Sequence, residues 1–277
     1  MSSCPRFEAF FLPTDLGVRF AIFHPPLGSV TRGGILYVHP FAEEMNKSRR
    51  MAALQSRAFA EAGFAVLQID FYGCGDSSGD FAQARWDIWK RDIASAAIWL
   101  KERTSGPLHL WGLRLGGMLA LDVWRDQPSQ FMSALLWQPV TSGMIFMTQF
   151  LRLAVAGNAL REGGGKGVTT DDLRKSLMSG NSIEVAGYEL TPALVSAIDG
   201  LNLIDFGIPA APIHWLDVKN ESSLTASTVA QRVIAAWRNS GAHVNYEAIQ
   251  GDPFWTTQEI VDAPNLIAVS TARYDAH

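Results

Sequence analysis

Residues Leu108 to Gly117 have the sequence LHLWGLRLGG, and this stretch decides the fold. It begins as a short apolar run typical of a buried strand and continues through Gly112 and Gly116 into a helical pattern. The G-x-x-x-G spacing is that of a nucleophile elbow, a strained turn in which small residues flank the middle position and let the chain pass closely. The middle residue is Arg114, so the serine expected there is absent. The alternative left open is a tightly packed strand-to-helix turn with no chemical role.

The rest of the chain alternates short apolar runs with longer helical patterns, which indicates an α/β fold with a mainly parallel sheet covered on both faces. We expect about eight strands, at residues 6–13, 18–24, 35–39, 65–70, 108–111, 134–137, 213–218 and 243–248, of which the first two form an antiparallel pair. Helices are expected at 48–62, 86–103, 115–125 and 225–239. The region 141–208 breaks this rhythm. It predicts a helical cap inserted into a core made of residues 1–140 and 209–277.

Composition narrows the class of protein. With 48% apolar and 18% charged residues, the 277-residue chain is neither disordered nor fibrous. The net charge of -4 and the scattered basic residues exclude a nucleic-acid partner. Only Cys4 and Cys74 occur, without paired spacing, and the six histidines are not clustered, so we expect no disulfide, no metal and no cofactor. We also expect no secretory signal, no membrane span and a cytoplasmic location.

Two further motifs follow neighbouring strands. Residues 68–79, QIDFYGCGDSSG, place D-x-x-G-x-G-x-S after a strand, and His39-Pro40-Phe41 ends the preceding strand where a hydrolase supplies an oxyanion N–H. With the elbow, these motifs resemble the α/β-hydrolase fold. Glycine-rich alternatives, a dinucleotide turn at Gly73 to Gly79 and a phosphate loop at Gly163 to Gly167, fail on spacing and context.

The resemblance extends to a narrower family. HPFAEEMNKSRRM at His39 to Met51, together with YGCGDSSGDF, WGLRLGG and the late GDPFW at Gly251 to Trp255, resembles the exosortase A system-associated hydrolases over essentially the whole chain. This resemblance implies a cytoplasmic bacterial protein connected with exopolysaccharide production and the sorting of proteins that bear PEP-CTERM tails. It does not supply a substrate.

The remaining triad positions are predicted by their place after the last strands. The acid of a hydrolase follows the seventh strand, where Glu221 is our first choice and Asp217 the second, and the histidine follows the eighth, where Asp252 stands. Arginine cannot act as nucleophile or base because its guanidinium stays protonated. We therefore expect Arg114, Glu221 and Asp252 to form an ion cluster. The alternative is that Asp252 caps a helix starting at Phe254 and Glu221 is a solvated loop residue.

Other candidate residues surround the elbow. His39, with Glu43 and Glu44 following within one loop, is the candidate for acid–base work, and His39 with Glu43 is the base we nominate; the alternative is that His39 only holds its loop by bonding backbone groups. The oxyanion donors are expected at the backbone N–H groups of Phe41 and Leu115.

The expected cap carries an apolar stripe. Its residues Met144, Met147 and Phe150 recur at helical spacing, which suits an acyl-chain pocket or plain core packing. Two functions stay open: an ester or thioester hydrolase or acyltransferase with a degenerate triad, or an inactive pseudo-hydrolase that serves as a binding or scaffold protein. The expected partners are a small acylated or anionic ligand and proteins of the exopolysaccharide and exosortase pathway.

Overall fold

A computed structural model describes residues 7–28, 31–162, 168–220 and 224–275. Its main sheet has eight strands in the order β1-β2-β4-β3-β5-β6-β9-β10. The strands are β1 (Glu8–Thr14), β2 (Gly17–His24), β3 (Gly33–Val38), β4 (Phe64–Ile69), β5 (Leu108–Leu113), β6 (Ser133–Trp137), β9 (Pro212–Lys219) and β10 (His243–Gln250). Strand β2 is antiparallel to both of its neighbours, and the other pairs are parallel. The expected strand number and the antiparallel opening pair are confirmed, and the strand order is that of an α/β-hydrolase fold.

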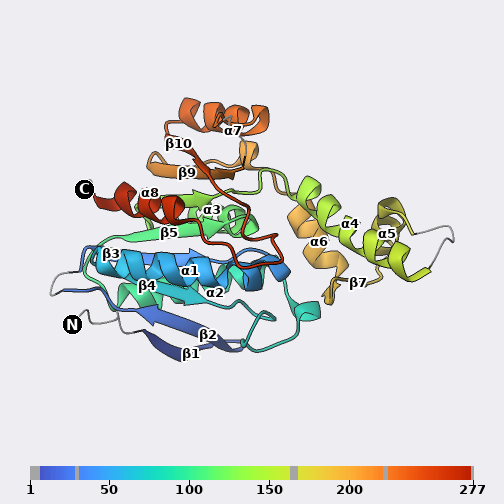
Figure 1. Cartoon of the computed structure of the whole chain (residues 1–277). Coiled ribbons are helices and arrows are strands. Elements are labelled where there is room, and N and C mark those ends of the chain that lie inside the picture. The colour runs from blue at the N-terminus through green and yellow to red at the C-terminus, as the bar shows by residue number, and fades with distance from the viewer. Residues whose placement is uncertain (1–6, 29–30, 163–167, 221–223, 276–277) are drawn as a thin grey trace.

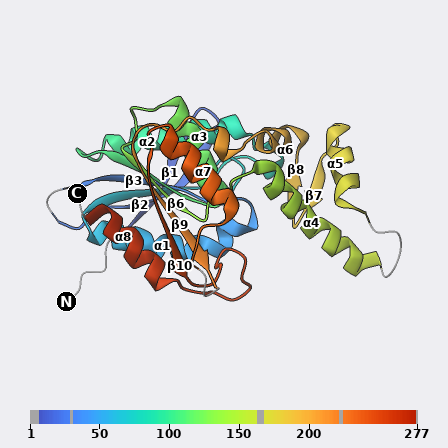
Figure 2. The same ribbon diagram turned by 90° about the horizontal axis from the view of Figure 1, so that it is seen from above.

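Helices cover both faces of this sheet (Figures 1 and 2). One face carries α2 (Trp86–Lys101), α3 (Leu115–Asp126) and α7 (Thr228–Asn239), and the other carries α1 (Glu43–Glu61) and α8 (Pro264–Asp275). Both faces pack densely because the central strands β3, β5 and β6 are buried along their whole length. Sequence patterns did not predict α8, and α1 begins at Glu43 rather than at the expected residue 48. This earlier start brings two glutamates into the first turn of α1.

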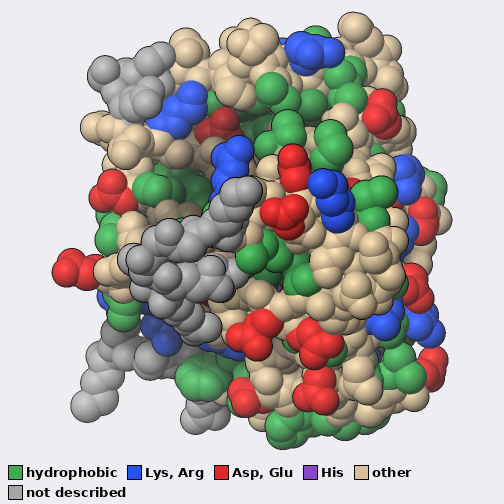
Figure 3. All heavy atoms as spheres, turned by 90° about the vertical axis from the view of Figure 1, so that its right-hand side faces the viewer, with side chains coloured by type: hydrophobic (Ala, Val, Ile, Leu, Met, Phe, Trp, Pro, Cys, Tyr) green, Lys and Arg blue, Asp and Glu red, His purple; other side chains and the backbone are tan. Residues whose placement is uncertain are grey.

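The segment between β6 and β9 forms a separate layer beside the sheet (Figure 1). It contains α4 (Gly143–Glu162), α5 (Thr170–Met178), a hairpin of β7 (Ile183–Val185) and β8 (Tyr188–Leu190), α6 (Pro192–Asp199) and the short 3-10 helix η2 (Leu203–Asp205). The hairpin was not expected; its turn residues Ala186 and Gly187 both have positive φ, as a tight hairpin requires. The segment shares one hydrophobic core with a face of the sheet. Figure 3, which views the molecule from this side, shows hydrophobic side chains scattered between charged ones.

Backbone strain is concentrated where three neighbouring strands end. Ala42, Arg114 and Gln138 follow β3, β5 and β6, and each has a positive φ, of 51°, 54° and 44°. Non-glycine residues adopt such angles only where surrounding structure holds them, and these positions cluster at functional sites. The carboxyl edge of the sheet is therefore the place to look for a site. Among the described helices, none is long and apolar enough to cross a membrane.

Candidate functional site

Arg114 stands at the crest of the turn between β5 and α3, with φ 54° and ψ -122°. The flanking glycines are required by close approach of the backbone. A Cβ on Gly116 would lie 2.2 Å from the carbonyl oxygen of Val38, and one on Gly112 would lie 2.5 Å from Cα of Gly117. The structure thus has the geometry of a nucleophile elbow, with arginine at the position of the nucleophile.

The Arg114 side chain is held by groups on four other segments. Its Nε donates to Oε1 of Glu44 at 3.2 Å, and its Nη1 donates to the carbonyl oxygen of Gln138 at 3.4 Å. The guanidinium carbon lies 5.5 Å from the ring centre of Trp255 and 6.0 Å from that of Phe146. These contacts leave the Arg114 side chain 18% exposed and that of Glu44 10% exposed. Arg114 is therefore a positioned cation at the edge of solvent.

Glu44 places a poorly solvated carboxylate beside this cation, and Glu43 precedes it in the first turn of α1. Each has a buried Oε2 with no hydrogen-bond partner among the described groups. Burial raises the pKa of Glu44, and Arg114 opposes this rise by charge and hydrogen bonding. Burial also raises the pKa of Glu43, while a bond from its own backbone and the charge of Lys47 lower it. Sequence analysis placed Glu44 with Glu43 in the loop after His39 as a candidate for acid–base work and did not connect it with Arg114. The signal that would have found it is the start of α1 directly at residue 43.

The expected triad partners lie elsewhere. Glu221 is outside the described residues. Asp252 is exposed and does not pair with Arg114, so the expected contact between them was wrong; the helix expected from Phe254 is absent too. The physical reason is that the Trp255 ring in this loop is buried against Arg114 and Asp252 is left facing solvent. Within the described part of the chain, the carboxylate that pairs with Arg114 is that of Glu44.

Asp217, the second choice for the acid, is committed to its own strand neighbours. It accepts a bond from Trp215 Nε1 at 2.7 Å and from the Tyr246 hydroxyl at 3.0 Å. Burial raises the pKa of Asp217, and these two bonds lower it. Oδ1 thus bonds within β9, and Oδ2 links β9 to β10 through Tyr246.

His39 has no free nitrogen for acid–base work. Its Nδ1 lies 2.7 Å from the carbonyl oxygen of Pro40, and its Nε2 lies 3.3 Å from the backbone nitrogen of Phe71. The N–H of Phe71 must donate, so Nε2 accepts and the proton is on Nδ1. Burial lowers the pKa of His39 to about 4, which keeps the ring neutral. These contacts favour the alternative that His39 holds its loop over its nomination as a base.

The two backbone N–H groups expected to act as oxyanion donors are unbonded, and their role stays a prediction. The backbone N–H groups of Phe41 and Leu115 have no hydrogen-bond acceptor within the described part of the chain. Both residues line a narrow apolar cavity of about 10 Å³, with Trp86, Trp89 and Cys74. That volume is room for about one water molecule. Next to the cavity, Phe146 and Phe150 of α4 pack edge-on against Phe41, with ring centres 5.7 Å and 5.1 Å away.

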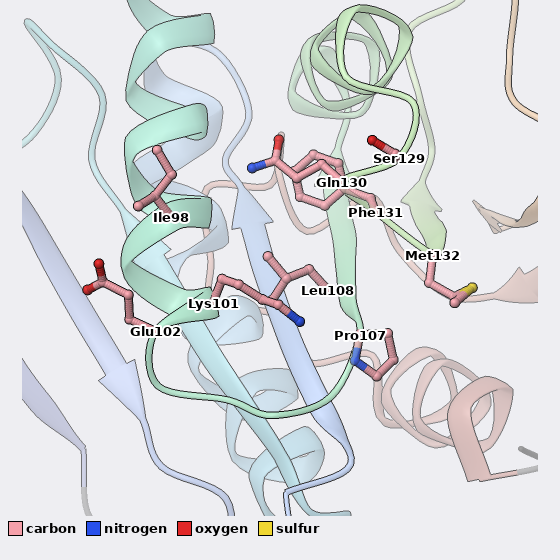
Figure 4. Close-up of a pocket in the computed structure, with 9 residues that line it drawn as sticks. All are labelled: Ile98, Lys101, Glu102, Pro107, Leu108, Ser129, Gln130, Phe131 and Met132. Atoms are coloured by element: carbon pink, nitrogen blue, oxygen red, sulfur yellow. The ribbon is translucent and has the colours of Figure 1, made fainter.

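The three side chains expected to line an acyl pocket do not form one among the described residues. Met147 and Phe150 are buried in the core, and Met144 is 56% exposed on the outer side of α4. A much larger cavity, of about 510 Å³, lies at the opposite edge of the sheet, where β5 begins (Figure 4). It is remote from the elbow because Leu108 and Arg114 lie at opposite ends of β5. No group of three or more metal-ligating side chains is found among the residues described.

The sheet order, the elbow and the two N–H donors define the α/β-hydrolase class, with an arginine where the nucleophile stands. The chain belongs to the Hydrolase_4 family, described as serine aminopeptidase, S33, whose model matches residues 29–194. It is 28% identical over 123 residues to the mitochondrial palmitoyl-protein thioesterase ABHD10 of Rattus norvegicus. That match covers 44% of this chain and 39% of the relative, well under two thirds of its length.

Solved structures share the fold. The structure of Est1E from Butyrivibrio proteoclasticus with bound ferulic acid superposes with a TM-score of 0.66 at 16% identity, and the match covers 97% of both chains. Alpha/beta hydrolase domain-containing protein 10 from mouse superposes with a TM-score of 0.61 at 16% identity, over 97% of this chain and 99% of that one. At these identities the likeness shows the fold alone.

Proposed function

We propose that this chain binds a small anionic or acylated ligand at the elbow and does not carry out serine-type hydrolysis. One observation carries the proposal: a positioned, partly exposed guanidinium stands where an attacking hydroxyl would be, 3.2 Å from Glu44. Arginine cannot attack a carbonyl, but it is well suited to bind a carboxylate or phosphate.

The surrounding donors support an anionic or carbonyl ligand. The N–H groups of Phe41 and Leu115 have no acceptor among the described residues. The helices α1 and α3 both begin at this edge of the sheet, and helix N-termini favour negative charge. Residues 141–208 are proposed to act as a cap on the core of 1–140 and 209–277, since Phe146 and Phe150 rest on Phe41. Opening the cap would admit an acyl chain.

The second candidate is ester or thioester hydrolysis or acyl transfer. It is supported by the retained oxyanion donors and by the similarity to relatives named palmitoyl-protein thioesterase. It needs a base other than His39, and Glu43, whose pKa is raised by burial, is the carboxyl available.

Binding and turnover measurements separate the two candidates. We expect decanoate and decanoyl-coenzyme A to bind in calorimetry, Arg114→Ala to abolish this binding, and aryl decanoate and thioester turnover to stay at background. Arg114→Ser is also expected to stay inactive, because no neutral imidazole lies beside the new hydroxyl. Turnover by the unaltered protein that Glu43→Gln abolishes would establish the second candidate and overturn the first.

The cellular setting is proposed from the motif resemblance alone. We place the protein in the cytoplasm, in the exopolysaccharide and exosortase pathway of its host. Deletion of the gene should lower exopolysaccharide yield, and complementation with the Arg114→Ala variant should fail to restore it. Unchanged yield after deletion would remove this setting.

A further inference from the structure

The elbow presents an electrostatic difficulty for any anion. Arg114 is already paired with Glu44, and Glu43 lies next to it in the first turn of α1. With both carboxyl groups ionised, Glu43 and Glu44 balance the positive charges of Arg114 and Lys47, so the cluster offers an anion no net positive charge, and the Glu44 carboxylate lies directly beside Arg114. An arriving anion would meet repulsion at short range in a site with little water to screen it.

We propose that the ligand anion binds Arg114 together with one proton, which is taken from solvent and held on Oε2 of Glu44. This inference rests on the proposed function and names the residue that selects the ligand. The balance is simple: the Glu44 carboxylate, one proton and the ligand carboxylate combine into a hydrogen-bonded pair, and no bond between heavy atoms changes. The protonated Oε2 donates to the ligand, and Arg114 donates to the same ligand.

The geometry of Glu44 suits this role. Its Oε1 accepts from Nε of Arg114, and Nη2, on the same edge of the guanidinium as that N–H, donates to no described residue. Its Oε2 is buried and has no hydrogen-bond partner among the groups described. This oxygen can therefore take up a proton and donate it to a ligand acceptor. The backbone N–H of Glu44 donates to the carbonyl oxygen of Phe41 at 3.1 Å, which fixes the residue beside the oxyanion loop.

The charged and titratable groups around Glu44 come from three segments. Arg114 faces it from the β5–α3 turn, Glu43 and Lys47 from α1, and the Tyr37 hydroxyl from β3. Burial raises the pKa of Glu44, Glu43 raises it further, and Arg114 and Lys47 lower it. A bound anion adds another negative charge and so raises the pKa of Glu44 again. Binding must therefore tighten as the pH falls.

The arrangement selects two classes of head group. A carboxylate binds with proton uptake, as described. A primary amide binds without it, because its carbonyl accepts from Arg114 and its N–H donates to the ionised Oε2 of Glu44. Decanoate and decanamide are therefore a matched pair of probes with the same apolar chain.

Calorimetric titration measures the proton directly. Decanoate is titrated near neutral pH, in two buffers that differ in ionisation enthalpy, and the difference in apparent enthalpy gives the protons taken up. We expect uptake of about one proton per decanoate and a Kd that rises up to about tenfold per pH unit above the Glu44 pKa. Decanamide should show no uptake and no such pH dependence.

Variants locate the proton. Glu44→Gln should bind decanoate without proton uptake and with a Kd nearly independent of pH, because the glutamine amide donates in place of the protonated carboxyl. Glu61→Gln, at the exposed far end of the same helix, is the matched control and should behave as the unaltered protein. Thermal unfolding checks that each variant folds. The uptake measured on the unaltered protein needs no variant.

The outcomes are distinct. Decanoate binding without proton uptake overturns this inference and leaves the proposed function standing. Uptake that survives in Glu44→Gln, or that disappears in Glu43→Gln instead, also overturns the assignment to Glu44. If neither decanoate nor decanoyl-coenzyme A binds at any pH, to the unaltered protein or to Glu44→Gln, the proposed function falls, and this inference falls with it.

Discussion

Replacement of Arg114 by alanine removes the cation that faces Glu44 and leaves the carboxylate buried without its partner. Alanine is the appropriate substitution because it experiences the same backbone strain at φ 54° as arginine does. Glycine would relieve that strain and add a stabilising effect of its own. The alanine variant therefore isolates the loss of the ion pair.

The magnitude follows from burial and geometry. Removing one partner of a buried ion pair costs about 3–5 kcal/mol. Here one bond of 3.2 Å joins the pair, and the side chains keep 18% and 10% of their exposure. Water screens part of the interaction, so we expect a loss of about 2–3 kcal/mol in the free energy of unfolding near neutral pH. Glu44→Gln should cost about 1 kcal/mol, because Arg114 keeps its bond to the Gln138 carbonyl and its contact with solvent.

The pH dependence has a definite sign. Without Arg114, the folded-state pKa of Glu44 rises further above its unfolded value, because the opposing charge is gone. A carboxyl group with a raised folded pKa destabilises the protein at high pH, and the loss disappears as the pH falls and the group becomes protonated in both states. The penalty for Arg114→Ala should therefore be full above the raised pKa and shrink toward the ordinary carboxyl range.

Urea unfolding, followed by tryptophan fluorescence, measures this effect for the unaltered protein, Arg114→Ala, Glu44→Gln and the double variant. The double variant should be more stable than Arg114→Ala alone near neutral pH, since no buried charge is left unpaired. A loss for Arg114→Ala that is absent near neutral pH, or equal at neutral and acidic pH, would refute the reasoning.

Three further outcomes are expected. Gly116→Ala should cost several kcal/mol of folding stability or prevent folding, because the new Cβ would lie 2.2 Å from the Val38 carbonyl oxygen. Gly157→Ala, where the new Cβ meets open space, should be harmless. Chemical denaturation compares the stability of the two variants. Burial lowers the pKa of His39 to about 4, so NMR should show no protonation of the ring above about pH 5. Folding stability should fall as the pH drops from the pKa of an unfolded histidine toward the lower pKa of His39 in the folded protein. Protonation of His39 near neutral pH would contradict its buried bonding. Met147→Ala should cost about 2–4 kcal/mol in thermal or urea unfolding, while the exposed Met144→Ala should cost little; equal effects would mean that the two side chains do not differ in packing.

Local patterns predicted most of the strands and helices because each central strand is a continuous apolar run bounded by turn residues. The helix α8 was missed because its pattern of apolar residues is weak, and the hairpin β7–β8 because its strands have three residues each. The extension of α1 back to Glu43 was missed for a different reason. It depends on Ala42 adopting a positive φ after β3, and an alanine carries no sequence signal for that conformation.

Sequence by itself determined the class of fold and the arginine at the middle of the elbow. Both can be read from one short stretch, because Gly112, Arg114 and Gly116 lie within a single strand-to-helix turn. The sequence did not determine which carboxylate meets that arginine. Only the tertiary structure decided this, by burying Trp255 against Arg114 and turning Asp252 to solvent, so that Glu44, 70 residues away along the chain, became the partner. Such a choice depends on how segments distant in the sequence pack together, and no spacing within the chain encodes it.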